Sequence, residues 1–187
     1  GEVLGVSGLM GAGRTEIMHS IFGDIPADSG EIYLSGSKVK INSPLQAKAL
    51  GIGYITEDRK TEGLMLPMSV RDNLSFAALS RFARGGLIQR QAEKQAIADM
   101  IRLLAIKTDG TAVPAGSLSG GNLQKFIVGR ELDRKPGVMV VNQPTWGVDA
   151  GAASRIRQAL VDLAKEGSAV LVISQDLDEI FEVATHI

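Results

Sequence analysis

The feature that most constrains this chain is a glycine-rich segment between a short apolar strand and a helix. Residues 8–15 read GLMGAGRT, which has the spacing of a phosphate-binding loop (P-loop). A buried strand is predicted at 3–7 and a helix from 14 to about 22, closed by Gly23. In such a turn, backbone N–H groups and the helix N-terminus bind phosphates, and the Thr15 hydroxyl can ligate Mg²⁺. A strand, a turn and a helix in this order predict an α/β domain built around a phosphate site.

Position 14 departs from the usual P-loop, because it holds Arg14 where lysine is ordinarily found. The guanidinium group of arginine is planar and wide, whereas the ammonium group of lysine is compact. Arg14 therefore keeps the positive charge but fits the phosphates differently. Taken alone, the segment could also be a glycine-rich turn without a chemical role.

Length and composition exclude several classes of protein. The 187 residues suit one α/β domain, and a net charge of -1 gives no broad positive field for nucleic acid. There are no cysteines, which excludes disulfides and thiolate metal sites. No apolar run approaches the ~20 residues of a membrane span, so we expect any membrane role to act through a partner. The chain opens at Gly1 and soon reaches the P-loop, as expected of a segment truncated at both ends.

The order of strand and helix patterns predicts a mostly parallel sheet with flanking helices. Further strands are expected at 52–55, 138–141 and 169–173, and an antiparallel β edge at 31–34 and 39–41 around a turn at 35–37. From 57 to 116 the strand pattern stops, and helices are expected after Ser69, with Asp72 completing a cap, and over 89–105. We therefore predict an ATPase-type core of residues 1–56 and 117–187 and a helical subdomain of residues 57–116.

A second motif, LSGGNLQK at 118–125, makes a family resemblance specific. It places a serine hydroxyl and free glycine N–H groups at the start of a helix that runs to about 133, which is another anion site. With both motifs the chain resembles the nucleotide-binding domains of ABC-type ATPases. In that family two domains dimerise head to tail, and each ATP lies between the P-loop of one domain and the signature motif of the other.

The resemblance implies two sets of nucleotide contacts. At the P-loop they are Gly8, Gly11, Ala12, Gly13, Arg14, Thr15 and Glu16. At the signature, facing the partner's ATP, they are Leu118, Ser119, Gly120, Gly121, Asn122 and Gln124. The implied cofactors are ATP and Mg²⁺, with Thr15 and Asn142 as the metal positions.

Several positions depart from the family's pattern. VMVVNQPT at 138–145 resembles the Walker B strand, but Asn142 and Gln143 replace the aspartate that organises Mg²⁺ and the glutamate that polarises the attacking water. Gln175 stands where the switch histidine is usual, and Glu57 stands at the Q-loop glutamine. Asp149 matches the D-loop aspartate. Nearby Trp146 could pack at an interface, but we expect it to cover the core. Gln143 and Gln175 are thus degenerate catalytic positions.

More narrowly, the P-loop, the TEDR segment at 56–59 and the signature resemble the second of two tandem domains in bacterial simple-sugar importer ATPases. The NQPT and QDLDE departures resemble the nucleoside-importing branch, so sugar and nucleoside both stay open. The implied partners are a companion nucleotide-binding domain (in the same chain or a second copy), a membrane permease and, indirectly, a solute-binding protein. The implied location is peripheral, at the cytoplasmic face of the inner membrane.

The pattern of altered residues predicts how such a domain works. The residues that act on ATP at its own P-loop are changed and the signature is intact, so the domain would assist hydrolysis at its companion's site. One alternative is a fully competent ATPase domain, and another is an ABC regulatory module without a transport role. A P-loop kinase or GTPase is excluded because the signature has no place in it.

Overall fold

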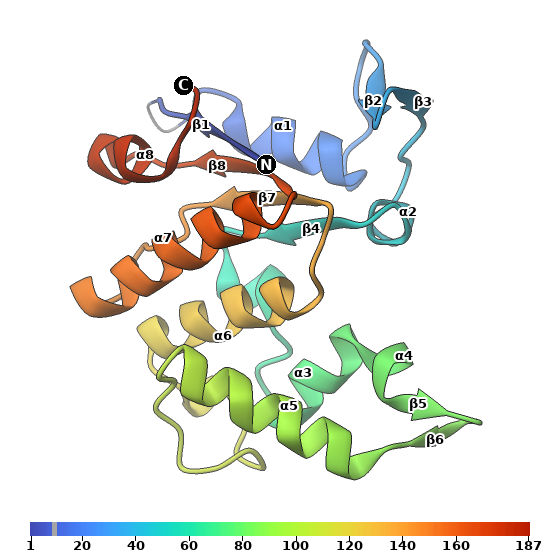
Figure 1. The fold of residues 1–187 in the computed structure, drawn as a ribbon, viewed down its shortest axis with the longest axis vertical. Coiled ribbons are helices and arrows are strands. Elements are labelled where there is room, and N and C mark those ends of the chain that lie inside the picture. The colour runs from blue at the N-terminus through green and yellow to red at the C-terminus, as the bar shows by residue number, and fades with distance from the viewer. Residues whose placement is uncertain (9–10) are drawn as a thin grey trace.

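The computed structural model describes residues 1–8 and 11–187, and its centre is a four-stranded parallel sheet (Figure 1). The strands are β1 (Glu2–Val6), β4 (Ile52–Ile55), β7 (Val138–Asn142) and β8 (Ala169–Ile173). They lie in the order β1-β8-β7-β4. Val6 pairs with Ile173, and Ile173 pairs with Asn142, so the carboxyl ends of these strands meet at one edge.

Alternating side chains of the sheet face two layers of helices. Val140 packs with α1 (Arg14–Phe22) and α2 (Pro44–Ala49). Its neighbours Met139 and Val141 point to the other face, because successive side chains of a strand alternate. That face is covered by α6 (Gly120–Asp133), α7 (Ala150–Lys165) and α8 (Leu177–Val183). Figure 1 shows α1 and α6 on opposite sides of the sheet, which confirms the predicted α/β class.

The predicted antiparallel edge is a separate two-stranded sheet of β2 (Ile32–Leu34) and β3 (Ser37–Val39). The second strand begins two residues earlier than predicted. The turn needs only Ser35 and Gly36, whose φ angles are 51° and 76°, so the chain is extended again from Ser37.

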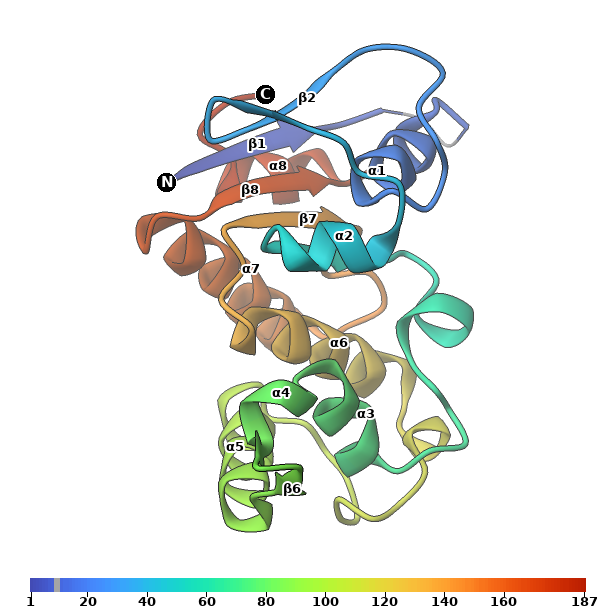
Figure 2. The same cartoon turned by 90° about the vertical axis from the view of Figure 1, so that its right-hand side faces the viewer.

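The chain between β4 and α6 is mostly helical, and its residues 70–103 lie on the side of α6 that faces away from the sheet (Figure 2). Its elements are a π-helical turn η1 (Arg59–Gly63), α3 (Val70–Ala77), α4 (Leu79–Phe82), β5 (Ala83–Arg84), β6 (Leu87–Ile88), α5 (Arg90–Leu103) and a 3₁₀ turn η2 (Ala115–Ser117). The expectation of no strand here was wrong, since β5 and β6 form a hairpin. Gly85 and Gly86, both at positive φ, make its turn, and two-residue strands are too short to show alternation.

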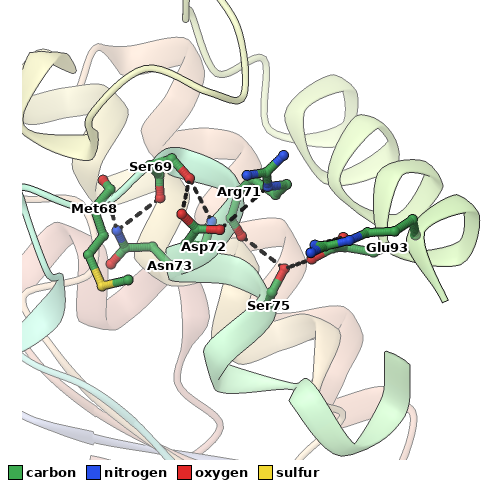
Figure 3. A network of polar contacts seen from close by, with 8 residues as sticks. Met68, Ser69, Arg71, Asp72, Asn73, Ser75 and Glu93 are labelled. Carbon is green, nitrogen blue, oxygen red and sulfur yellow. Dashed lines mark hydrogen bonds and ion pairs between the residues drawn. The ribbon is translucent and has the colours of Figure 1, made fainter. Parts of the chain in front are cut away.

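A buried polar network fixes the start of α3 and joins it to α5 (Figure 3). The Ser69 hydroxyl accepts the Asp72 amide at 3.0 Å, which confirms the predicted cap. Asn73 accepts the Met65 amide and donates to the Met65 carbonyl, each at 2.9 Å. Further along α3, the Ser75 hydroxyl donates to the buried carboxylate of Glu93 on α5. Within residues 1–8 and 11–187, no helix has the length and apolar character of a membrane span.

Candidate functional site

The loops that follow the four parallel strands emerge side by side, and they carry most of the predicted site. The P-loop follows β1, the 56–58 segment follows β4, the 143–145 segment follows β7 and the 174–176 segment follows β8. In open parallel sheets, ligands bind at the carboxyl ends of the strands. The topology therefore brings residues far apart in sequence to one place.

The P-loop has the backbone that a phosphate cradle requires. Gly8, Gly11 and Gly13 have φ angles of 156°, 80° and 78°, and Gly13 is the N-cap of α1, which begins at Arg14. Leu9 and Met10 lie outside the described residues. The hollow at this turn is lined by Gly11, Ala12, Gly13, Arg14, Thr15, Glu16, Glu57 and Gln175. Six of the seven residues predicted for the P-loop contacts are therefore brought together with two residues from other loops.

Two oxygen atoms converge beside this hollow. The buried Asn142 side-chain amide donates from Nδ2 to Thr15 Oγ1 at 3.5 Å and to Glu57 Oε2 at 3.3 Å. Mg²⁺ takes oxygen ligands, commonly one or two carboxylates completed by substrate phosphates and water. In the described part of the chain no three His, Cys, Asp or Glu side chains cluster to hold a metal. Thr15 and Glu57 thus fit a cation that a nucleotide brings with it.

Gln143 and Gln175, which the sequence predicts to be degenerate catalytic positions, contact each other. Gln143 adopts a φ of 50° and its side chain is buried, with Oε1 accepting the backbone N–H of Gln175 at 3.5 Å. The Arg14 guanidinium reaches the same segment, where Nη1 donates to the Ser174 carbonyl at 3.5 Å. The loops after β1, β7 and β8 are therefore tied together through amide and guanidinium groups.

The predicted signature residues lie at the start of α6, apart from the P-loop hollow. Ser119 is the N-cap residue, and its hydroxyl accepts Nδ2 of Asn122 at 3.0 Å. A hollow beside Leu118 and Ser119 shares no lining residue with the P-loop hollow. A methyl group added to Gly120 would meet no atom within 4 Å, whereas one added to Gly121 would lie 3.2 Å from the Gly147 carbonyl.

Two of the predicted signature residues point into the domain. Asn122 is buried and accepts the Lys107 amide at 3.0 Å. Gln124 is 1% exposed, and its amide donates to the carbonyls of Gln143 and Pro144 at 3.3 and 2.9 Å. Gln124 therefore links the signature helix to the loop after β7.

Asp149 begins α7 and is exposed. Its carboxylate accepts the Ala152 amide at 2.8 Å, which caps the helix, and that hydrogen bond lowers the pKa of Asp149 below its ordinary value. Lys125 Nζ lies 4.0 Å from the same carboxylate.

The geometry has counterparts among known proteins. The model of the ABC transporter family matches residues 1–146. This chain belongs to the ABC transporter family.

Two curated relatives extend the likeness to the rest of the domain. The chain is 50% identical over 182 residues to ribose import ATP-binding protein RbsA 1 of Mesorhizobium japonicum. It is 46% identical over 187 residues to ribose import ATP-binding protein RbsA of Geobacillus kaustophilus. These matches cover 96% and 100% of the chain but 35% and 38% of the relatives, so the chain spans little more than a third of their length.

Solved ATP-binding cassettes share the fold of this ABC transporter domain. One is a dimeric post-hydrolysis structure bound to ADP and Pi, with a TM-score of 0.80 and 20% identity, covering 97% of this chain and 78% of that one. Another is a nucleotide-free cassette from an ABC transporter, with a TM-score of 0.77 and 23% identity, covering 98% of this chain and 74% of that one.

Sequence reasoning assigned no role to one arginine of this ABC transporter domain and misplaced a tryptophan. Arg59 Nη1 donates to the Gly120 carbonyl at 2.9 Å, which ties η1 to the signature. No sequence pattern indicates which distant carbonyl an arginine will meet.

Trp146 does not cover the core, because it is 63% exposed and lines a second hollow with Thr15 and Glu57. The turn at Gly147, with a φ of 68°, leads the chain to the surface there.

Proposed function

We propose that this chain is an ATP-binding domain of an importer that couples ATP binding and hydrolysis to the uptake of a simple sugar. Family membership supports the ATP-binding part. The names of the relatives, which are ribose import ATP-binding proteins, support the sugar. Because the chain matches little more than a third of each relative, it is suited to be one of two tandem domains, and its motifs favour the second.

The domain's own P-loop site binds nucleotide but hydrolyses it slowly. The contact between Gln143 and Gln175 carries this proposal. A side-chain amide has no basicity with which to accept a proton from water, and that of Gln143 is buried and engaged with the Gln175 backbone. Losing a general base typically costs about 10²- to 10⁴-fold in rate.

The signature serves ATP held by a companion domain. The hollow beside Ser119 shares no lining residue with the P-loop hollow, which supports a separate nucleotide for each. A dimeric arrangement is found in a solved cassette of the same fold. The partners are therefore a companion nucleotide-binding domain, a permease and, through the permease, a solute-binding protein, at the cytoplasmic face of the inner membrane.

The test is ATP turnover by the assembled transporter. Ser119→Arg places a long cation at the signature, whereas Arg14→Ala removes the P-loop cation. Ser37→Arg, in exposed β3, controls for the added charge. We expect turnover to fall at least about 100-fold for Ser119→Arg and less than about threefold for Arg14→Ala, because only the signature serves the active site. An equal collapse for both variants would mean that both sites hydrolyse ATP.

A further inference from the structure

Glu179 on α8 is a buried carboxylate to which neither the predicted motifs nor the proposed function give a role. It is 2% exposed, and its Oε2 accepts the hydroxyl of the fully buried Ser174 at 2.6 Å. Ser174 immediately precedes Gln175, which lines the P-loop hollow. We propose that Glu179 is a positioning residue, which holds the turn after β8 so that Gln175 stays at the nucleotide site. The inference rests on the proposed function, because the nucleotide is the ligand whose affinity Glu179 sets.

Ser174 connects Glu179 to the other loops of the site. Its backbone N–H donates to the Val6 carbonyl at 3.2 Å, at the end of β1, and its carbonyl accepts Nη1 of Arg14 at 3.5 Å. Its hydroxyl accepts the Asp176 amide at 3.1 Å while it donates to Glu179. A hydroxyl has one proton, so the carboxylate decides where that proton points and leaves a lone pair for the amide. Loss of this acceptor would therefore loosen the turn.

The helix that carries Glu179 is held firmly in place. The Asp176 side chain caps α8 by accepting the amides of Asp178 and Glu179 at 3.0 and 3.4 Å. On β1, a Cβ at Gly5 would lie 2.6 Å from Cγ2 of Ile180, so the strand and the helix are in close contact. A side chain on such a support can hold its hydrogen-bond partner in one position.

The charge of Glu179 costs stability, which a residue serving the fold alone would not explain. Burial raises its pKa above the ordinary 4.5, and Ser174, Thr145 and Arg157 offset this only in part. The charge of Asp176 raises the pKa of Glu179 further. The folded state therefore favours the neutral acid, and the ionised form reduces stability as the pH rises above about 4.5. Groups perturbed in this way cluster at functional sites.

The test measures the affinity of the 187-residue chain for Mg²⁺·ATP by titration calorimetry. Glu179→Met removes the acceptor but keeps a side chain of similar length. Glu179→Gln keeps an acceptor for the Ser174 hydroxyl and removes the charge. Glu182→Met is the control, because Glu182 lies on the same helix but is exposed and pairs with Arg157. Circular dichroism and a thermal melt establish that each variant is folded.

We expect Glu179→Met to weaken ATP binding about tenfold or more, which is the effect of losing one hydrogen bond to a charged group. Glu179→Gln and Glu182→Met should stay within about twofold of the unaltered chain, since both keep an acceptor at the turn. Ser174→Ala removes the same hydrogen bond from its other end. It should weaken binding to a similar extent, and combining it with Glu179→Met should cause little further loss. If Glu179→Met does not fold, Ser174→Ala decides.

Two results would overturn the inference while the P-loop assignment stands. One is an unchanged ATP affinity in folded Glu179→Met or Ser174→Ala, because the hydrogen bond would then serve the fold alone. The other is an equal loss in Glu179→Gln and Glu179→Met, because an acceptor would then not be what holds Gln175. If the unaltered chain binds no Mg²⁺·ATP, the proposed function fails and the inference fails with it.

Discussion

Gln124 joins the signature helix to the loop after β7 through buried hydrogen bonds. Replacing Gln124 by Met tests how much these hydrogen bonds contribute to the free energy of unfolding. Its Nε2 donates to the Gln143 carbonyl at 3.3 Å and to the Pro144 carbonyl at 2.9 Å. Met has a similar length and volume but no donor. Gln124→Met therefore removes both hydrogen bonds without opening a large cavity.

The carbonyls of Gln143 and Pro144 contribute differently to the expected loss of free energy of unfolding. The Gln143 carbonyl keeps a hydrogen bond from the Trp146 amide at 3.2 Å, so it loses one neutral hydrogen bond, about 1 kcal/mol. The Pro144 carbonyl is left buried without its donor, which costs about 1–3 kcal/mol. Together the free energy of unfolding should fall by about 2–4 kcal/mol. Because about 1 kcal/mol shifts Tm by roughly 2–4 °C at this size, Tm should fall by about 4–16 °C.

Calorimetry and urea denaturation measure this loss against a matched control. Gln158→Met removes an exposed hydrogen bond on α7, where Nε2 of Gln158 donates to Asp162 at 2.8 Å. Such a pair contributes about 0.2–0.5 kcal/mol. If Gln124→Met costs no more than Gln158→Met, the buried link does not hold the signature helix to the loop, and the reasoning is refuted.

Two further predictions concern the buried carboxylate of Glu93 on α5 and the close approach of backbone to Gly23. Burial raises the pKa of Glu93, but hydrogen bonds from Ser75 and Arg90 outweigh it and hold the pKa below the ordinary 4.5. The stabilisation from Glu93 is thus present above about pH 4.5 and is lost as the pH falls further. Urea melts should therefore show the stability advantage over Glu93→Gln shrinking as the pH is lowered below about 4.5, and a constant difference would contradict this. A Cβ on Gly23, at a φ of 77°, would lie 2.8 Å from a backbone nitrogen, whereas one on Gly86, at 78°, would meet nothing within 4 Å. Gly86→Ala should cost only the strain of about 1–2 kcal/mol and Gly23→Ala about 2–5 kcal/mol by calorimetry; equal losses would rule out the backbone clash.

The strands and the order of the motifs were predictable because their signals are local. The apolar runs of β1, β7 and β8 are each bounded by turn residues, and the P-loop glycines stand where a left-handed backbone is needed. The strand order β1-β8-β7-β4 was not predictable in this way, because it depends on which strands pair across the whole chain. The hairpin of β5 and β6 was missed since two-residue strands carry no periodicity.

The separate motifs of the site were also predictable, but their mutual contacts were not. Asn142 and Glu57 are 85 residues apart, and Arg59 and Gly120 are 61 residues apart. Each contact is decided by the direction of a side chain at the edge of the sheet, which no spacing rule encodes. The burial of Gln124 could have been inferred from Ile127 and Val128, which lie three and four residues further along and so share its face of the helix.

The segment after β4 contacts both predicted nucleotide sites of the domain. Glu57 bonds the Asn142 amide on the P-loop side, and Arg59 bonds the Gly120 carbonyl of the signature. Between them, Asp58 accepts the amides of Lys60 and Thr61 at 3.0 and 3.1 Å, which fixes the turn. A substitution that disturbs this turn is therefore expected to affect both predicted sites at once. Glu57→Gln keeps the side-chain shape and an acceptor for the Asn142 amide, so it should remove the charge of Glu57 and leave the turn in place.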